Sequence, residues 1–305
     1  MDAPGRIALV TGVAGFTGRY MQAELQACGY RVVGIGSASA AGDADYRQVD
    51  LLDRLGLRDV LEQVRPDVVV HLAAQAFVAH GNADDFYQVN LIGTRHLLEA
   101  VAGSGKVPGC VLLASSANVY GNAQEGPLDE ETPPAPTNDY AVSKLAMEYM
   151  ARLWTDRLPL VLARPFNYTG VGQTDNFLIP KIVGHFRGKK SIIELGNLDV
   201  SRDFNDVRNV VKLYRALIER PQAVGQTVNI GSGVAWSLRE VAAMCEQLTG
   251  WQVQLRVNPA FVRANEVRTL SADTTRLHGL VGDFDAIPLR ETLRWMLKAS
   301  TGQNA

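Results

Sequence analysis

The feature that most constrains the fold of this chain is a regular alternation of short apolar runs and helical patterns before residue 165. The apolar runs are rich in branched side chains, which is typical of buried parallel strands. Strands that alternate with helices predict an α/β fold, a doubly wound parallel sheet with helices on both faces. The expected strands are IALVTG (7–12), RVVGI (31–35), DVVVHLAA (67–74), CVLLASS (110–116) and PLVLARP (159–165), and helical patterns cover 17–29, 84–105 and 138–154.

The alternation breaks down after Arg164. A helix near 206–219 and a strand at 227–231 are expected to return to the first sheet, which gives one lobe of residues 1–165 with 204–231. Residues 166–203 with 232–305 are expected to form a smaller C-terminal lobe. That lobe should contain loops at 165–177 and 196–204, helices near 176–188, 238–248 and 289–297, and strands at 191–195 and 252–257.

Composition excludes several classes of partner. The net charge of -2 gives no electrostatic footprint for DNA, RNA or an anionic membrane surface. The three cysteines lie far apart, without metal-ligand or redox spacing, so we expect free thiols, no metal site and a reducing cytosol. The N-terminus lacks a signal-peptide pattern and no run approaches 18 apolar residues. The expected location is cytoplasmic.

Three glycines follow the first expected strand and open the first expected helix. Gly12, Gly15 and Gly18 form G-x-x-G-x-x-G, one position away from the G-x-G-x-x-G dinucleotide fingerprint. Such glycines allow a tight turn, a close approach of the backbone to a pyrophosphate and a helix N-terminus that faces the anion. Their place at the first strand–helix junction predicts a Rossmann lobe that binds NAD or NADP, rather than a plain structural turn.

The end of the second strand bears on the choice of cofactor. Gly36 and Ser37 stand where an acid would bind the ribose 2′-hydroxyl of NAD, which favours NADPH and leaves NADH possible. Arg19 is placed to reach a 2′-phosphate. Asp50 is expected to accept a hydrogen bond from the adenine amino group or to cap the next helix.

A serine, a tyrosine and a lysine form the expected catalytic group. Tyr140 and Lys144 lie four residues apart in YAVSK and so share one face of a helix. A nearby ammonium is expected to lower the tyrosine pKa, so that the phenol can pass a proton near neutral pH. Ser116 follows an apolar strand and should hold a substrate carbonyl oxygen against that phenol. The pattern predicts reduction of a ketone by hydride from a nicotinamide.

These residues together resemble the extended short-chain dehydrogenases/reductases that act on nucleotide sugars. The motifs TGVAGFTG, HLAAQ, SSANVYG, YAVSK, ARPFN and RDFNDV occur in the family's order and spacing. The resemblance implies Ser116, Tyr140 and Lys144 as catalytic residues. It also implies a cofactor site made of Gly12, Gly15, Phe16, Thr17, Gly18, Arg19, Asp50, Leu51, Leu72, Ala73, Ala74, Asn90, Tyr140, Lys144 and Phe166.

Other positions separate the reactions that this family carries out. Related dehydratases have an Asp-Glu pair where this chain has Ala117 and Asn118, which cannot titrate. Members that epimerise C3 and C5 carry a cysteine and a histidine where Asn118 and, approximately, Gln173 or Thr174 stand here. We therefore expect a simple 4-keto reductase. A 4-epimerase, which needs the same three residues, and a non-catalytic NADP-binding regulator are the alternatives.

The expected substrate is a nucleotide 4-keto-6-deoxyhexose. LGNLDVSRDF, RPFNYTGVGQTDNF and VNPAFVRANEV resemble GDP-4-keto-6-deoxy-mannose reductases, which implies reduction of GDP-4-keto-6-deoxy-D-mannose to GDP-D-rhamnose. A dTDP-4-keto-6-deoxyglucose reductase would look similar. In such relatives arginines grip the diphosphate. The resemblance implies a substrate site made of Gln75, Ser116, Ala117, Asn118, Asn167, Asn176, Arg202, Arg263 and Glu266.

Two helices carry apolar residues on more than one side. One covers about 84–102 and the other about 139–155, and each needs a partner besides the sheet. Family resemblance suggests that the pair meets its symmetry mate in a four-helix bundle, so we expect a homodimer.

Overall fold

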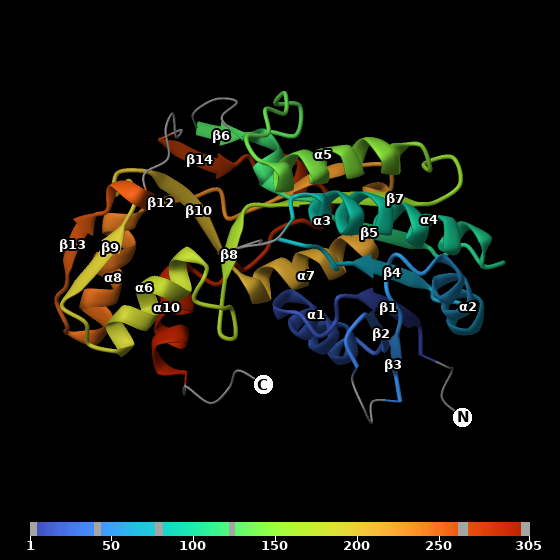
Figure 1. Cartoon of the computed structure of the whole chain (residues 1–305), viewed down its shortest axis with the longest axis horizontal. Helices are drawn as coiled ribbons and strands as arrows, with labels where there is room; N and C mark the ends of the chain where they lie inside the picture. The colour runs from blue at the N-terminus through green and yellow to red at the C-terminus, as the bar shows by residue number, and fades with distance from the viewer. Residues whose placement is uncertain (1–4, 40–43, 77–81, 122–125, 262–267, 300–305) are drawn as a thin grey trace.

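The computed structural model describes residues 5–39, 44–76, 82–121, 126–261 and 268–299. Its larger sheet has seven parallel strands in the order β11-β7-β5-β4-β1-β2-β3 (Figure 1). The order reverses between β1 and β4, and ligands of doubly wound sheets bind at the carboxyl ends of the strands beside such a point. The strands are β1 (Ile7–Thr11), β2 (Arg31–Gly36), β3 (Tyr46–Gln48), β4 (Val68–His71), β5 (Cys110–Ala114), β7 (Leu160–Pro165) and β11 (Thr227–Ile230).

Helices cover both faces of this sheet, as the alternating pattern predicts (Figure 1). Successive strand residues point to opposite faces, so Val10 packs in one core and Leu9 in the other. Burial of each such side chain contributes about 1.5–3 kcal/mol to stability. The first core includes α1 (Phe16–Ala27), α7 (Val207–Ile218) and α9 (Thr275–Val281), and the second includes α2 (Arg54–Val64), α4 (Thr94–Gly103) and α5 (Asp139–Arg152).

A second group of elements lies beside the carboxyl ends of the large sheet (Figure 1). Strands β12, β10, β14 and β6 form a sheet in that order, and β8 pairs with β10. Helices α6, α8 and α10 share a third core. The bounds are β6 (Gly126–Leu128), β8 (Asn167–Thr169), α6 (Leu178–Arg187), β9 (Ile192–Leu195), β10 (Ser201–Asp206), β12 (Ala235–Ser237), α8 (Leu238–Thr249), β13 (Gln254–Val257), β14 (Thr269–Ala272) and α10 (Leu289–Lys298).

The structure corrects the sequence expectation at three places. The expected loop 165–177 contains β8, and the expected loop 196–204 contains the start of β10. These strands were missed because they are short and polar: the buried Asp203 of β10 is stabilised by backbone N–H groups of Ser232, Gly233 and Ala272. The expected helix over 84–105 is divided into α3 (Asp84–Tyr87), a π-helical turn (Gln88–Gly93) and α4.

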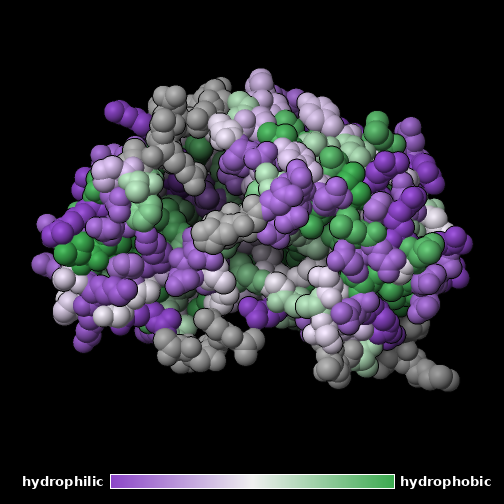
Figure 2. Space-filling model, viewed as in Figure 1, coloured by the Kyte–Doolittle hydropathy of each residue, from purple (hydrophilic) through white to green (hydrophobic). Residues whose placement is uncertain are grey.

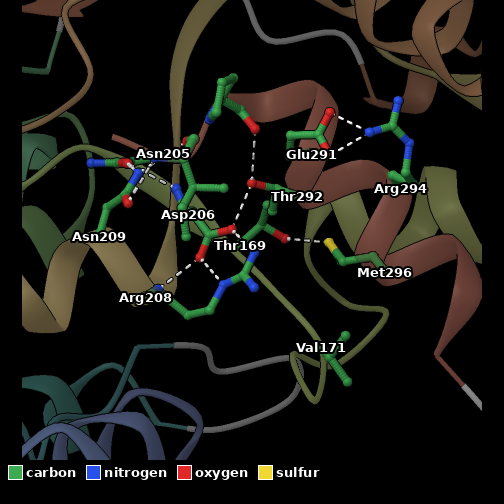
Figure 3. Close-up of polar contacts among 12 residues, drawn as sticks. Thr169, Val171, Asn205, Asp206, Arg208, Asn209, Glu291, Thr292, Arg294 and Met296 are labelled. Carbon is green, nitrogen blue, oxygen red and sulfur yellow. Dashed lines mark hydrogen bonds and ion pairs between the residues drawn. The ribbon is translucent and has the colours of Figure 1, made fainter. Parts of the chain in front are cut away.

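The C-terminal helix α10 is tied to the start of α7 by a buried carboxylate (Figure 3). Asp206 caps α7 and accepts hydrogen bonds from the Arg208 guanidinium and, at 2.7 Å, from the Thr292 hydroxyl. The Arg208 guanidinium also stacks over the Trp295 ring, 3.9 Å from its centre. These contacts link the two groups of elements, which we propose to be the two lobes inferred from the sequence.

Within the described ranges, no helix combines the length and apolar character that crossing a membrane requires.

Candidate active site

A cavity of about 860 Å³ opens at the carboxyl ends of β1, β4, β5 and β7. Figure 2 shows that this face of the molecule is hollowed between the large-sheet part and the part that carries α6, α8 and α10. Most of the site residues inferred from the sequence line this cavity. They are Gly12, Gly15, Phe16, Thr17, Gly18, Leu72, Ala74, Ser116, Ala117, Asn118, Tyr140, Lys144, Phe166, Asn167 and Arg202.

Other expected site residues lie behind the cavity wall or away from it. Asn90 is fully buried and bonds the backbone of Gln75 through both atoms of its amide. Ala73 packs on Gly12, and Leu51 packs on Gly93. The Arg19 guanidinium lies beside Gly172, and Asp50 and Asn176 are exposed. Arg263 and Glu266 lie outside the described residues.

Several residues of the cavity wall were missed by the sequence reasoning. They come largely from the polar strands and loops described above, so hydrophobic patterning gave no signal for them. Tyr168 and Thr169 follow the motif ARPFN directly, and this proximity is the one signal that the sequence offered. The missed wall residues include Thr137, Asn138, Tyr168, Thr169, Phe177, Leu178, Phe204 and Leu270.

The glycine loop forms a cradle that side chains would fill. Gly12 has φ +68°, and a Cβ atom there would lie 2.8 Å from the backbone of Ala73. A Cβ atom on Gly18 would lie 2.1 Å from the Gly12 carbonyl oxygen. Gly15 precedes α1 without a side-chain cap, and the first residues of the helix line the cavity. The loop therefore fits the pyrophosphate of a dinucleotide.

The described segment after β2 has no acid, as the sequence predicts, but Asp50 does not cap the helix that follows it. Ser37 is exposed, and no acid lies in the described stretch that follows it, residues 37–39. The cap of α2 is Asp53, whose carboxylate accepts from the Gly56 N–H. Asp50 instead accepts from the Leu52 N–H, 2.8 Å away, which closes the preceding turn. A contact with adenine stays a prediction.

Ser116, Tyr140 and Lys144 meet at one wall of the cavity. Ser116 lies two residues beyond the end of β5 and caps a short 3₁₀ helix (Ala117–Tyr120), and its hydroxyl is hydrogen-bonded to Tyr140. Asn138 caps α5, because its side-chain oxygen accepts from the Ala141 N–H. Tyr140 and Lys144 then lie one helical turn apart, and the Lys144 ammonium donates to the Ala114 carbonyl over 2.8 Å.

The electrostatics of this group differ from the expectation. Burial raises the pKa of Tyr140 to about 12, and the Ser116 hydrogen bond offsets only part of the rise. Burial also lowers the pKa of Lys144 to about 8, against the attraction of the Glu148 carboxylate. Lys144 is not among the causes of the Tyr140 shift, so the expected lowering of the tyrosine pKa by this ammonium is not found; the loss of solvent around the phenol dominates.

A buried ion pair supports the wall from behind. Glu148 lies one turn after Lys144, and its carboxylate accepts hydrogen bonds from Nε and Nη2 of Arg164, at 2.9 and 2.6 Å. The Ser115 hydroxyl donates to the same carboxylate over 2.5 Å. Because Ser115 precedes Ser116, this pair ties the end of β5 to α5, and so fixes the serine relative to the tyrosine and lysine.

The remaining cavity wall is poor in groups that could exchange protons. Among the described lining residues there is no aspartate, glutamate, histidine or cysteine. Lys144, Tyr140, Tyr168 and Arg202 are the ionisable side chains of that set. A phenol and a hydroxyl that lie side by side can each turn their one proton toward the same carbonyl oxygen when a substrate replaces the contact between them. The described wall offers no separate acid and base for the removal of water or of a carbon-bound proton.

Comparison with known proteins agrees with this architecture. Residues 9–296 match the family described as GDP-mannose 4,6 dehydratase. The chain is 33% identical over 294 residues to GDP-6-deoxy-D-talose 4-dehydrogenase of Aggregatibacter actinomycetemcomitans, covering 95% of this chain and 96% of the relative. It is 35% identical over 299 residues to GDP-6-deoxy-D-mannose reductase of Pseudomonas aeruginosa, covering 94% and 95% of the two chains.

Two solved structures are similar to this chain over nearly its whole length. A candidate epimerase of Burkholderia cenocepacia J2315 has 51% identity and a TM-score of 0.91, covering 96% of this chain and 97% of that one. The protein RMD of Pseudomonas aeruginosa, solved with NADPH, has 32% identity and a TM-score of 0.83, covering 96% and 98%.

Proposed function

Because the chain belongs to the GDP-mannose 4,6-dehydratase family of extended short-chain dehydrogenases/reductases, which are NAD(P)-dependent enzymes that modify nucleotide sugars, we propose that it is a 4-keto reductase. Its proposed substrate is GDP-4-keto-6-deoxy-D-mannose, and its product is GDP-D-rhamnose. The observation that carries this proposal is the cavity wall, whose described part holds Ser116, Tyr140 and Lys144 but no carboxylate, imidazole or thiol. Hydride and proton transfer to a ketone need no more than these three side chains and the cofactor.

The proposed cofactor is NADPH, which supplies the hydride when it is bound. The cradle of Gly12, Gly15 and Gly18 would hold its pyrophosphate. Gly36 and Ser37 present no carboxylate to repel a 2′-phosphate. The similarity to the protein RMD, which was solved with NADPH, supports the same choice.

In the proposed reaction the side chains share the work on the carbonyl oxygen. Ser116 and Tyr140 both donate hydrogen bonds to it, and the Tyr140 proton passes to the oxygen as negative charge develops there. The Lys144 ammonium stabilises the tyrosinate that remains. The hydrogen bond from the Lys144 ammonium to the Ala114 carbonyl holds this ammonium in place.

The nucleotide is proposed to lie toward the smaller lobe. Arg202 lines the cavity there, and its guanidinium donates to the Ser201 carbonyl at 2.9 Å and the Arg268 carbonyl at 3.3 Å, which hold the side chain in place. A guanidinium fixed in this way suits a diphosphate. Guanine recognition rests on the relatives, whose names specify GDP sugars.

A second candidate product follows from one of these relatives. GDP-6-deoxy-D-talose differs from GDP-D-rhamnose in its configuration at C4, and the similarity to a GDP-6-deoxy-D-talose 4-dehydrogenase favours this outcome as the alternative. The same residues serve both products, since the difference lies in which face of the ketone receives the hydride.

The test is product identification by proton NMR in deuterated water. GDP-4-keto-6-deoxy-D-mannose is incubated with NADPH and, separately, with NADH. We expect faster turnover with NADPH, reduction at C4 and no deuterium at C3 or C5; the coupling constants at H4 separate rhamnose from talose. Deuterium at C3 or C5 would mean an epimerising enzyme. If the GDP-keto sugar caused no oxidation of NADPH or NADH, the reductase would be rejected.

A further inference from the structure

A buried histidine lies between two threonine hydroxyls beneath the cofactor side of the cavity. His71 is the last residue of β4 and is 1% exposed. Its Nδ1 atom lies 2.7 Å from the Thr11 hydroxyl oxygen, and its Nε2 atom lies 2.8 Å from the Thr94 hydroxyl oxygen. Because the ring has a polar partner at both nitrogens, its protonation state depends on which partners can donate.

The surrounding hydrogen bonds determine which atom of each pair donates its proton. The Thr11 hydroxyl oxygen accepts from the backbone N–H groups of Leu72 at 3.1 Å and Ala73 at 3.0 Å. Both of its lone pairs are then used, so its own proton points to His71 Nδ1. That nitrogen must therefore be unprotonated. The neutral ring carries its proton on Nε2 and donates to Thr94, which in turn donates to the Asn90 carbonyl over 2.7 Å.

The charged groups around the ring act in the same direction. A second proton on His71 would point at an oxygen that has no lone pair left for it. The Lys144 ammonium on α5 also repels a charged imidazole, and burial together with this repulsion lowers the pKa of His71 to about 3. The ring therefore stays neutral throughout the range in which proteins of this kind work.

This series of hydrogen bonds continues to α5, the helix that carries Tyr140 and Lys144. The Asn90 amide donates to the Ser143 hydroxyl over 3.0 Å, and that hydroxyl donates to the Tyr140 carbonyl over 2.8 Å. At the other end, Leu72 lines the cavity and Ala73 packs on Gly12 of the glycine cradle. Asn90 lies in the π-helical turn, a local structure that is frequent at functional sites. Every link is a polar group inside the protein, so a lost link is costly.

We propose that His71 is a positioning residue that sets the cofactor cradle and the Tyr140 turn in one geometry, through a relay of Thr11, neutral Nε2-protonated His71, Thr94, Asn90 and Ser143. His71 and Thr94 do not belong to the described cavity wall, so the relay acts through the residues at its two ends. The inference rests on the proposed cofactor site and on the proposed role of Tyr140.

The tautomer is tested first, on the full chain with ¹⁵N-labelled histidine. We expect one of the five histidines to have a protonated Nε2 and a bare Nδ1, with no titration between pH 5 and pH 8. Thr11→Val removes the donor to Nδ1 but leaves the Nε2 proton its acceptor on Thr94. The tautomer should therefore stay the same, while the Nδ1 signal moves because that nitrogen loses its hydrogen bond, which also assigns it to His71. A protonated Nδ1 in the natural protein, or titration near pH 6.5, overturns the relay.

The second test measures NADPH affinity and turnover in Thr94→Val. This change leaves the Nε2 proton without its acceptor, and we expect the NADPH dissociation constant to rise about tenfold, equivalent to about 1.4 kcal/mol, with a fall in kcat. Thr94→Ser keeps the hydroxyl and should restore both values. Thr132→Val, which removes a buried threonine hydroxyl bonded to Asp129, should change neither by more than about twofold.

The outcomes separate this inference from the proposed function. Histidine NMR and NADPH binding need no sugar substrate, so both can support the relay in a protein that fails to reduce the GDP-keto sugar. A folded Thr94→Val protein with natural NADPH affinity and kcat would reject the relay. If Thr94→Val fails to fold, the Nδ1 signal in Thr11→Val still decides, because a signal that does not move would show that Thr11 donates no hydrogen bond to His71 and would reject the relay.

Discussion

Tyr140 is the side chain on which the proposed chemistry depends most. Tyr140→Phe removes the phenolic proton and keeps the ring, which packs edge-on against Phe86. General acid catalysis is worth roughly 10²–10⁴-fold, so we expect kcat to fall by about that factor while NADPH binding is largely retained. Stopped-flow turnover and NADPH fluorescence titration measure the two effects. Turnover near that of the natural enzyme would show that another group donates the proton.

Lys144 gives the reaction a predictable pH dependence. Its pKa is lowered to about 8 by burial, so its positive charge is present below pH 8 and is lost as the pH rises through that value. We expect kcat to fall on the alkaline side with an apparent pKa near 8. Glu148 opposes this shift, so Glu148→Gln should move the alkaline limb to lower pH by roughly one unit.

The control for this prediction is another buried acid. Glu130 bonds the Asn229 N–H and pairs with Arg276, and it is not among the causes of the Lys144 shift. Glu130→Gln should leave the alkaline limb in place. An unmoved limb in a folded Glu148→Gln protein would mean that Lys144 is not the group that titrates.

Arg202 is the residue that tests where the nucleotide lies. Arg202→Ala removes a charge-assisted contact worth about 1.5–3 kcal/mol, so KM for the GDP-keto sugar should rise roughly tenfold or more. NADPH affinity should stay nearly unchanged, because the cofactor cradle lies at Gly12 to Gly18. Arg239→Ala, at an exposed arginine paired with Asp199, is the matched control. An unchanged KM in Arg202→Ala would place the diphosphate elsewhere.

At the scale of elements, α10 offers two side chains of opposite expected importance on one helix (Figure 3). Thr292 is fully buried and donates to the Asp206 carboxylate. Thr292→Val keeps the shape and loses this bond, so the free energy of unfolding should fall by about 1.5–3 kcal/mol. Glu291 pairs with Arg294 on the exposed side, and Glu291→Gln should change stability by less than about 0.5 kcal/mol. Urea unfolding of both variants decides; equal effects would contradict this account of how α10 is held.

The elements also show where sequence reasoning succeeds and fails. The buried strands of the large sheet were found because each is a continuous apolar run, and α5 was found by its helical pattern over 138–154. Strands β8, β10, β12 and β14 were missed because their polar residues find partners only in the folded chain, as Asp203 does with three backbone N–H groups. The support of the site by Glu148 and Arg164 was missed for the same reason: their pairing across 16 residues carries no local signal.

At the scale of the whole molecule, one helix presents an apolar stripe to solvent. Val142, Tyr149 and Leu153 lie at seven- and four-residue spacings along α5 and its cap, and they are 38%, 57% and 81% exposed. The other helix expected to have a second apolar face differs, because Leu97 and Leu98 are buried against the sheet. The apolar surface left for a partner is therefore concentrated on α5, and we propose that a second copy of the chain covers it about a twofold axis.

The prediction is a homodimer held through α5. Light scattering at micromolar concentration should give twice the chain mass of 33.1 kDa. Leu153→Glu places a charge at the most exposed residue of the stripe, where burial in the dimer without a partner is costly, and should give the mass of one chain. Leu55→Glu is the matched control, because Leu55 is 74% exposed on α2, away from the stripe, and the dimer should persist. A natural protein with the mass of one chain would contradict the dimer, whereas a dimer unaffected by Leu153→Glu would place the contact on another face.

Since α5 also carries Tyr140 and Lys144, a dimer through this helix would stiffen the element that holds the proposed catalytic pair. Leu153→Glu should then lower kcat as well as the mass.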